Sequence, residues 1–356
     1  MTPKERIRAT LDRQPVDRPA VDLWHTAEVA ASLRAHLGVE DNLSLYRALD
    51  IDKIIWVAMD YRTETGDKAF TLTGEAGKRT AWGVLLKDIQ AGEAHYAEFG
   101  EAPLAAYDSL EEIAAYPLWP DVDRFDYADA TRQAEAATAA GFAVIGPWVS
   151  LFEVYCQLRG LEQSMVDLFE DPDLVDGILD RIEAIQTEMM RRYFATAAKS
   201  LDLVFVSDDI AGQQSLLMSP ASWQRHLQPR LKRWCDLIHE HGLRVLYHTD
   251  GAARKLLGPI IDCGVDVLNP IQHACPGMDM AELKAEFGDR VIFHGGVDNQ
   301  SVLPRGTPEE VRAEVQLCRR TLGGGGQGYI CCSCHNTQAG TPVENILALI
   351  DEAKRG

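Results

Sequence analysis

The chain has 356 residues, of which 46% are hydrophobic and 25% are charged, and this balance excludes a largely disordered protein. The formal net charge of −19 at pH 7 excludes a nucleic-acid or anionic-membrane surface, because phosphate binding requires clustered lysine and arginine. No apolar run approaches the roughly 18 residues that a membrane span needs, and no export signal is visible. We therefore expect a cytoplasmic protein whose eight cysteines are reduced.

The first residues indicate the start of a helix, since Thr2, Pro3 and Glu5 have the spacing of a capping box. Short apolar runs then alternate with amphipathic stretches, which is typical of parallel strands joined by crossover helices. The eight predicted strands span residues 20–24, 53–59, 143–149, 201–207, 244–248, 265–270, 291–294 and 328–332. The clearest predicted helices span residues 172–197, 220–241, 252–263, 279–287, 307–322 and 342–354. This alternation favours an α/β fold of the closed (β/α)8 TIM-barrel type, with one domain over residues 1–356.

Residues 60–104 depart from this alternation. They contain short β-like pieces at 69–73, 80–87 and 95–99, broken by glycine and charged residues. Such a pattern is typical of antiparallel strands joined by turns. We therefore predict a β-hairpin insertion after the second strand, covering one mouth of the barrel.

Nearly every predicted strand ends in a polar or ionisable side chain. The carboxyl ends of parallel barrel strands converge on one face, so these side chains are expected to line a polar pocket there. A purely structural barrel would have no reason for this, because each buried polar group needs a partner. The side chains selected are His25, Trp148, Asp208, Asp209, His248, Asp250, Asn269, Gln272, His294, Cys334, His335 and Asn336.

Two pairs of these residues have informative spacing. His248 and Asp250 are two apart, so on an extended chain they face the same way and can act as metal ligands or as an acid–base pair. Asp250 could equally cap the helix that follows. Asp208 and Asp209 are adjacent, so one at most faces the pocket and the other caps the next turn.

Three cysteines crowd the end of the last strand, directly before His335. Thiolate and imidazole are both good zinc ligands, although the chain lacks the two regular Cys-x-x-Cys pairs of a zinc finger. Cys331 and Cys332 are interpreted as small core residues, and Cys334 and His335 as the candidates for a ligand role. His25, His273 and His294 are interpretable either as site residues or as hydrogen-bonded structural histidines.

The sequence resembles the uroporphyrinogen decarboxylase superfamily over nearly its whole length, and within it the methyltransferase-like branch. The matching stretches are MTPKERIRATLDRQPVDRP, LLMSPASWQRHLQPR, HGLRVLYHTDG, VDVLNPIQ, GMDMAELKAEFGDRVIFHGGVDNQ and CHNTQAGTPVENI. The true decarboxylases of this superfamily carry an arginine-rich Met-Arg-Gln-Ala-Gly-Arg motif near the N-terminus that holds substrate carboxylates. Residues 21–28 here read VDLWHTAE, without arginine, and this favours the methyltransferase branch.

The resemblance also implies a metal site. The methyltransferase branch binds zinc through a His-x-Cys pair and a distant cysteine. His248 matches the first ligand, Asp250 replaces the cysteine of the pair, and His335 falls on the distant position. Cys334 is an additional or alternative ligand. A His/Asp/His set is harder than one with two thiolates, so a bound zinc should stay a better Lewis acid and favour an oxygen-containing substrate.

The function implied is methyl transfer between a small O- or N-methylated substrate and a corrinoid carried by a separate protein, since no Asp-x-His-x-x-Gly corrinoid motif is present. Nucleic acid and membrane are not expected as partners, and a homodimer is left open. The catalytic assignment is His248, Asp250 and His335 with Asp208 or Asp209. The substrate-binding assignment is His25, Trp148, Asn269, Gln272, His294 and Asn336.

Two alternatives remain at this point. One is a cofactor-free decarboxylase of an acidic substrate, in which Asp208 or Asp250 protonates the carbanion. It would need a basic pocket formed by Arg62, Arg159 or Arg230. The other is a non-catalytic barrel that binds a ligand.

Overall fold

Eight parallel strands form the centre of the protein. The computed structural model describes residues 1–69, 74–91, 94–324 and 328–355. The strands lie in the order β1-β12-β11-β10-β9-β8-β7-β2, and every hydrogen-bonded pair is parallel. This confirms the predicted (β/α)8 barrel. The strand bounds are β1 (Ala20–Val21), β2 (Ile55–Trp56), β7 (Val144–Val149), β8 (Leu203–Ser207), β9 (Arg244–His248), β10 (Val267–Asn269), β11 (Ile292–His294) and β12 (Tyr329–Cys331).

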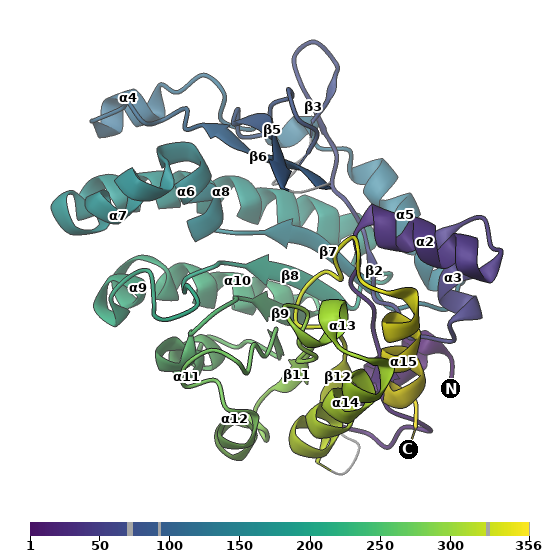
Figure 1. Ribbon diagram of the computed structural model, residues 1–356. Coiled ribbons are helices and arrows are strands. Elements are labelled where there is room, and N and C mark those ends of the chain that lie inside the picture. Colours follow the sequence, from purple (N-terminus) through teal and green to yellow (C-terminus); the bar gives the residue numbers. More distant parts are fainter. Residues whose placement is uncertain (70–73, 92–93, 325–327, 356) are drawn as a thin grey trace.

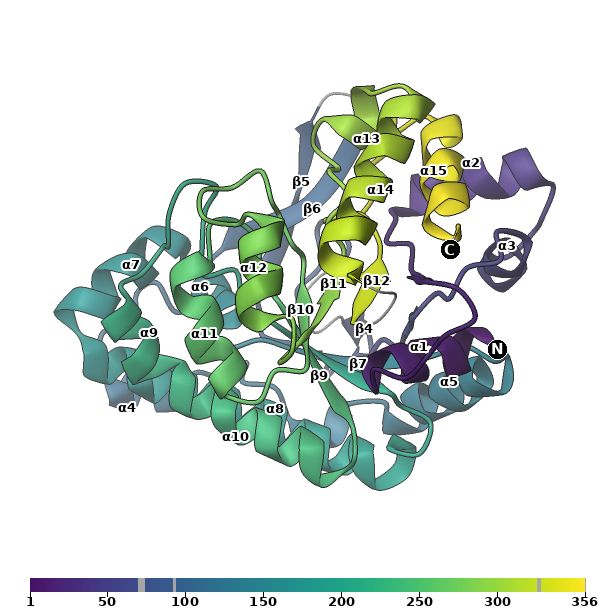
Figure 2. The same cartoon turned by 90° about the horizontal axis from the view of Figure 1, so that it is seen from below.

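Helices surround these strands, as the two perpendicular views show (Figure 1, Figure 2). The predicted helix 172–197 agrees with α8, and the predicted capping box is present at the start of α1. The helix bounds are α1 (Pro3–Leu11), α2 (Ala27–Leu37), α3 (Asn42–Ala48), α4 (Leu110–Ala114), η1 (Val122–Arg124), α5 (Tyr127–Ala139), α6 (Phe152–Arg159), α7 (Leu161–Glu170), α8 (Pro172–Ala197), α9 (Pro220–His226), α10 (Gln228–Glu240), α11 (Arg254–Asp262), α12 (Met280–Phe287), α13 (Val302–Arg305), α14 (Pro308–Gly323) and α15 (Val343–Ala353). Among the described residues, no helix combines the length and the apolar character that crossing a bilayer requires.

One predicted helix is in fact two helices. The stretch 220–241 is broken at Leu227 into α9 and α10. Pro229 lies in the first turn of α10, where its missing N–H costs nothing. The same ring would clash with a carbonyl of the preceding turn in an unbroken helix, so the chain restarts there.

An antiparallel ribbon interrupts the strand–helix alternation between β2 and β7. Its strands are β5 (Leu85–Ala91) and β6 (Ala94–Glu101), and a smaller antiparallel pair precedes it, β3 (Tyr61–Arg62) with β4 (Lys68–Ala69). The predicted piece 80–87 begins too early, because β5 starts at Leu85. Residues 70–73 of the predicted piece 69–73 lie outside the described residues. In Figure 1 the ribbon lies alongside α6 and α8.

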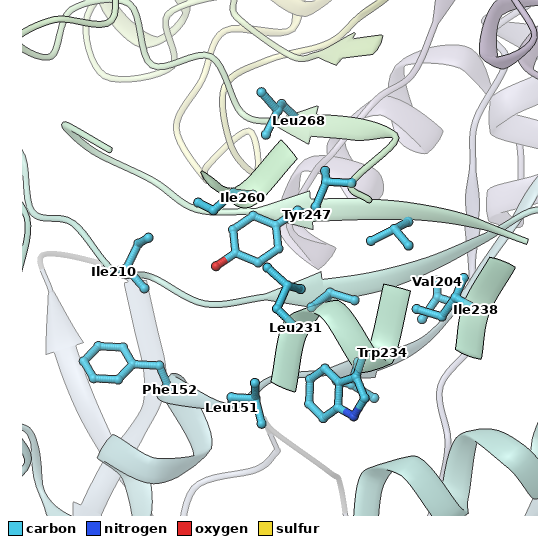
Figure 3. Close-up of a cluster of buried hydrophobic side chains, with 14 of the residues drawn as sticks. Leu151, Phe152, Val204, Ile210, Leu231, Trp234, Ile238, Tyr247, Ile260 and Leu268 are labelled. Atoms are coloured by element: carbon cyan, nitrogen blue, oxygen red, sulfur yellow. The ribbon is translucent and has the colours of Figure 1, made fainter. Parts of the chain in front are cut away.

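The core has two layers because side chains alternate along each strand. Leu203 and Phe205 of β8 point into the barrel, where they meet inward residues of the other strands. Val204 and Val206 point outward, into the layer between the sheet and the helices. Figure 3 shows this outer layer, in which Tyr247 of β9 and Trp234 of α10 lie among aliphatic side chains. All eight cysteines are free, and Cys331 and Cys332 are fully buried core residues, as predicted.

The barrel is closed by side chains at one seam. β1 and β2 lie at opposite ends of the strand order and do not pair with each other. Instead, the N–H of Val21 donates to the Asp52 carboxylate over 3.0 Å, and the N–H of Asp52 donates to the carbonyl of Val21 over 2.7 Å. The N–H of Ile54 donates to Asp22 over 3.2 Å. Two buried carboxylates and one main-chain hydrogen bond thus take the place of the missing ladder.

We expect Asp52→Asn to destabilise the protein by about 3 kcal/mol, because it removes the charge that pairs with Arg6 and Arg18 inside the protein. Asp50→Asn is the matched control: Asp50 contacts the same Arg18 at 3.4 Å, but its side chain is 72% exposed. It should cost less than about 1 kcal/mol. Thermal unfolding of both variants measures the difference, and equal losses would contradict the role given to Asp52.

Candidate active site

Three neighbouring strands each place one polar side chain inside the barrel mouth. The imidazole of His248, at the end of β9, lies 2.6 Å from Oδ1 of Asn269 through its Nδ1. Nδ2 of Asn269, at the end of β10, lies 2.7 Å from Nδ1 of His294 and 3.4 Å from the carbonyl of His294. A carbonyl can only accept, so the amide NH2 faces His294 and the amide oxygen faces His248. Nδ1 of His248 therefore carries the proton, and the lone pair of its Nε2 is free.

The same hydrogen-bonded chain ends on a buried carboxylate. With Nδ1 of His294 accepting, its Nε2 carries a proton and donates to Oδ2 of Asp22 over 3.1 Å. Burial opposes the charge on Asp22, but Lys53, at 3.1 Å, and His294 hold the pKa of this carboxyl below its usual range. Asp22, His294, Asn269 and His248 thus form a buried relay that fixes the tautomer and orientation of His248.

The free Nε2 of His248 faces a group of possible ligands. It lies 3.8 Å from Oδ1 of Asp250 and 4.0 Å from Oδ1 of Asp209, and the rings of His248 and His335 have centroids 5.5 Å apart. The ligand atoms of His248, Asp250 and His335 all lie within 4.8 Å of one another. Burial, and then the neighbouring His248, lower the pKa of His335, which favours the neutral imidazole that can bind a metal. Burial raises the pKa of Asp250, against the two imidazoles that lower it.

Cys334 points away from this three-residue group. Its thiol lies 3.3 Å from the carbonyl of Ile271, to which it donates, and burial raises the pKa of the thiol well above its usual range. Cys334 does share a small cavity of about 180 Å³ with Asp250, His335 and Gln272. Oε1 of Gln272 accepts from the N–H of Gly251 over 2.8 Å, so its side chain is held at the edge of that cavity.

The adjacent carboxylates Asp208 and Asp209 separate as their spacing predicts. Asp208 is fully enclosed and accepts hydrogen bonds from the Ser150 hydroxyl, over 2.8 Å, and from the N–H groups of Phe152 and Glu153. It therefore caps the start of α6 rather than the turn after its own strand, and burial raises its pKa to about 7. Asp209 faces His248 and accepts from the N–H of Asp250 over 3.1 Å.

Two predicted substrate-binding residues lie at the seam instead of at the three-residue group. Nε2 of His25 is 2.9 Å from the hydroxyl of Tyr46, and its Nδ1 is 3.0 Å from the carbonyl of Thr26. His25 and Asn336 line a cavity of about 460 Å³ between β1, β2 and helices α3 and α5. The lining of this cavity does not include His248, Asp250 or His335.

An aromatic wall forms the other half of the mouth, and of its tryptophans only Trp148 was predicted as a site residue. Trp24 follows β1, Trp56 ends β2, and Trp148 lies on β7. Ring centroids are 5.5 Å apart for Trp24 and Trp56, and 5.6 Å for Trp148 and Phe205. Trp24 stacks on His248 at 5.8 Å, so the wall touches the relay. The signal in the sequence was one inward-facing tryptophan in each of three successive strand regions.

Glu153 is a second residue that sequence reasoning missed. It lies in the first turn of α6, and its carboxylate accepts from the hydroxyl of Ser207 at the end of β8. Burial, and then the charge of Asp209, raise the pKa of Glu153 to about 8. In the sequence it is one acid in an apolar turn, which gives no reason to place it beside strand β8.

Each of the three arginines considered for a basic pocket forms an ion pair with a carboxylate. Arg159 is buried against Asp167 at 2.6 Å, and Arg230 is paired with Asp176 at 3.1 Å. Arg62 is half-exposed and lies 3.6 Å from Asp126. Each of these cations is neutralised by a carboxylate, so none of them provides the carboxylate clamp that an acidic substrate would need.

Residues 91–356 match the family model described as uroporphyrinogen decarboxylase (URO-D), and the chain belongs to this family. The methylcobamide:CoM methyltransferase MtbA of Methanosarcina mazei is 23% identical over 361 residues, which cover 99% of this chain and 98% of that protein. The uroporphyrinogen decarboxylase of Thermus thermophilus is 29% identical over 178 residues, 49% of this chain and 48% of that protein. A solved methyltransferase structure from Methanosarcina mazei has the same fold, with a TM-score of 0.67 at 20% identity over 99% of this chain and 98% of that one.

Glu153→Gln should flatten the pH dependence of stability. A folded-state pKa of about 8 against an ordinary value of 4.5 means that the folded protein keeps a proton that the unfolded chain has lost. The free energy of unfolding therefore falls as pH rises between these two values, by on the order of 5 kcal/mol. The glutamine variant lacks this loss, whereas Glu101→Gln, at an exposed acid nearby, should follow the wild type. The test is the unfolding temperature of each variant, measured from pH 5 to pH 9. Parallel curves of unfolding temperature against pH for wild type and Glu153→Gln would contradict the raised pKa of Glu153.

Proposed function

We propose that the protein is a methyltransferase that moves a methyl group between a small O- or N-methylated compound and a corrinoid carried by a separate protein. The observation that carries this proposal is the convergence of His248, Asp250 and His335 at the barrel mouth, with the lone pair of His248 Nε2 directed into the group. Full-length similarity to a methylcobamide-dependent methyltransferase supports it, whereas the similarity to decarboxylases spans about half of the chain.

The three residues fit a zinc ion. Their ligand atoms lie within 4.8 Å of one another, and a tetrahedral zinc site with three protein ligands keeps one position for substrate. The buried relay supplies the hydrogen bond that a ligating histidine normally makes through its other nitrogen. Zinc bound there would act as a Lewis acid toward an oxygen or nitrogen of the substrate.

The remaining residues have roles that do not depend on the metal. Trp24, Trp56 and Trp148 keep water from one side of the mouth, so that charges on the other side act in a less polar medium. Methyl transfer is an in-line displacement, in which the leaving group develops negative charge or must already be positive. His248 is held by the relay and Asp209 by the N–H of Asp250, so neither needs to reorganise during the reaction.

His335→Ala should lower zinc affinity at least tenfold, because it removes one of three ligands. Wild-type protein dialysed against zinc should hold about one ion per chain, measured by elemental analysis. Cys334→Ser should keep the metal, since the thiol faces the carbonyl of Ile271. His273→Ala is the control, because His273, Glu314 and Cys318 form another group with ligand spacing. Zinc lost from His273→Ala but kept by His335→Ala would overturn the assignment.

The methyl-transfer reaction can be followed directly under anaerobic conditions. The protein is mixed with a reduced corrinoid protein and a panel of O- and N-methylated compounds, and the cobalt absorbance is recorded. We expect at least one donor to convert cobalt(I) to the methylated form, and His248→Ala to slow this by at least about a hundredfold. A broad panel that leaves the absorbance unchanged in both directions of transfer would refute the proposed function.

A further inference from the structure

A third cavity, of about 470 Å³, lies beside Asp209, between the β5–β6 ribbon and helices α6 and α7. Its volume is within the range of small-molecule sites. Glu101, Glu153 and Asp209 contribute carboxyl groups to it, and Phe99 contributes an aromatic ring. Among the described residues that line it there is no lysine, arginine or histidine. An anionic ligand would therefore meet only repulsion in this cavity.

The cavity also contains an acceptor without a donor. Gln157 lines it, is 6% exposed, and its Oε1 is buried with no hydrogen-bond partner. A buried polar atom of this kind normally has a partner, and leaving it without one costs free energy. Asp209 adds a carboxylate to the same wall, and Glu153 adds a carboxyl group whose pKa burial raises to about 8. The lining thus favours a ligand that is positively charged or donates hydrogen bonds.

Asp209 connects this cavity with the three-residue group His248, Asp250 and His335. Its carboxylate lies 4.0 Å from Nε2 of His248, and His248 stacks on Trp24 at 5.8 Å. Asp209 thus borders both the acidic cavity and the three-residue group. The cavity itself has an aromatic ring, that of Phe99, and aromatic rings beside carboxylates bind methylated ammonium groups through cation–π attraction.

The chemistry of methyl transfer also favours a cation. A neutral amine cannot release a methyl group, because its nitrogen would leave as a strongly basic anion. In a quaternary or protonated ammonium ion the C–N bond breaks, its electron pair stays on nitrogen, and a neutral amine leaves. The methyl carbon forms its new bond with the electron pair of cobalt(I), which is formally oxidised to cobalt(III). For a quaternary donor no proton has to be supplied.

We propose that the methyl donor is a small N-methylated ammonium compound that also carries an oxygen group. Its ammonium group lies in the acidic cavity at the carboxylate of Asp209, and its oxygen binds at His248, Asp250 and His335. This inference rests on the proposed methyltransferase function and names the substrate class for it. Within the described lining, the lack of a cation beside Glu153 and Asp209 distinguishes this donor from an acidic methyl ether.

The test compares choline with 3,3-dimethyl-1-butanol, its neutral isostere, in which carbon replaces the ammonium nitrogen. Binding to the full chain is measured by calorimetry and by tryptophan fluorescence, without corrinoid. We expect choline to bind at least about tenfold more tightly than the isostere. Near neutral pH, Asp209→Asn should weaken choline binding severalfold and leave the isostere unchanged, whereas Glu153→Gln replaces a carboxyl group that still holds its proton there and should change choline binding little. Glu98→Gln, an exposed acid on β6 outside the cavity lining, is the matched control and should change neither.

These outcomes separate the two proposals. If the isostere binds as well as choline, or neither binds, the ammonium site is overturned, whatever the corrinoid assay shows. If choline binds as expected but no methylated compound alters the cobalt absorbance, the ammonium site stands and the methyltransferase function fails. The unfolding temperature of Asp209→Asn excludes misfolding as the cause of weaker binding, and loss of choline binding in Glu98→Gln would place the cation elsewhere.

Discussion

The fully buried carboxylate of Asp22 is the interaction on which both the barrel closure and the site depend. It accepts hydrogen bonds from the N–H groups of Leu23 and Ile54, from Nζ of Lys53, from Nε1 of Trp24 and from Nε2 of His294. These donors come from the first, second and seventh strand regions of the barrel. An ionised carboxylate can be buried only when its oxygens are satisfied in this way, so the five donors are positioned together.

The two halves of the mouth are coupled through this carboxylate. On one side it holds Trp24, whose ring begins the aromatic wall and stacks on His248. On the other side it fixes the tautomer of His294, and through Asn269 that of His248. A neutral group in place of Asp22 would loosen an apolar surface and a polar relay at the same time. The site is thus preorganised by a residue that lies below it and that need not touch a ligand.

Part of the negative charge of the chain is gathered at the barrel mouth. Taken over the whole sequence, a net charge of −19 is explained by solubility. Asp209 nevertheless shares a cavity with Glu153 and faces His248 together with Asp250, so three acids gather at the mouth. Burial and mutual repulsion raise the pKa of Glu153 as a result. Acids held at such a cost are typical of functional sites.

The pattern of apolar residues predicted the barrel and its polar strand ends, and the family resemblance implied the grouping of His248, Asp250 and His335. The apolar period of a strand or a helix is a local property, and β9 and α8 were predicted with their observed bounds for this reason. The tertiary structure alone decided which distant residues meet. Asp22 and His294 are 272 positions apart, and Glu153 reaches Ser207 across two elements. In the folded protein the thiol of Cys334 also donates to the carbonyl of Ile271, and Asp208 caps the start of α6. Closure of the barrel sets these contacts, and no local pattern records which strand a side chain will face.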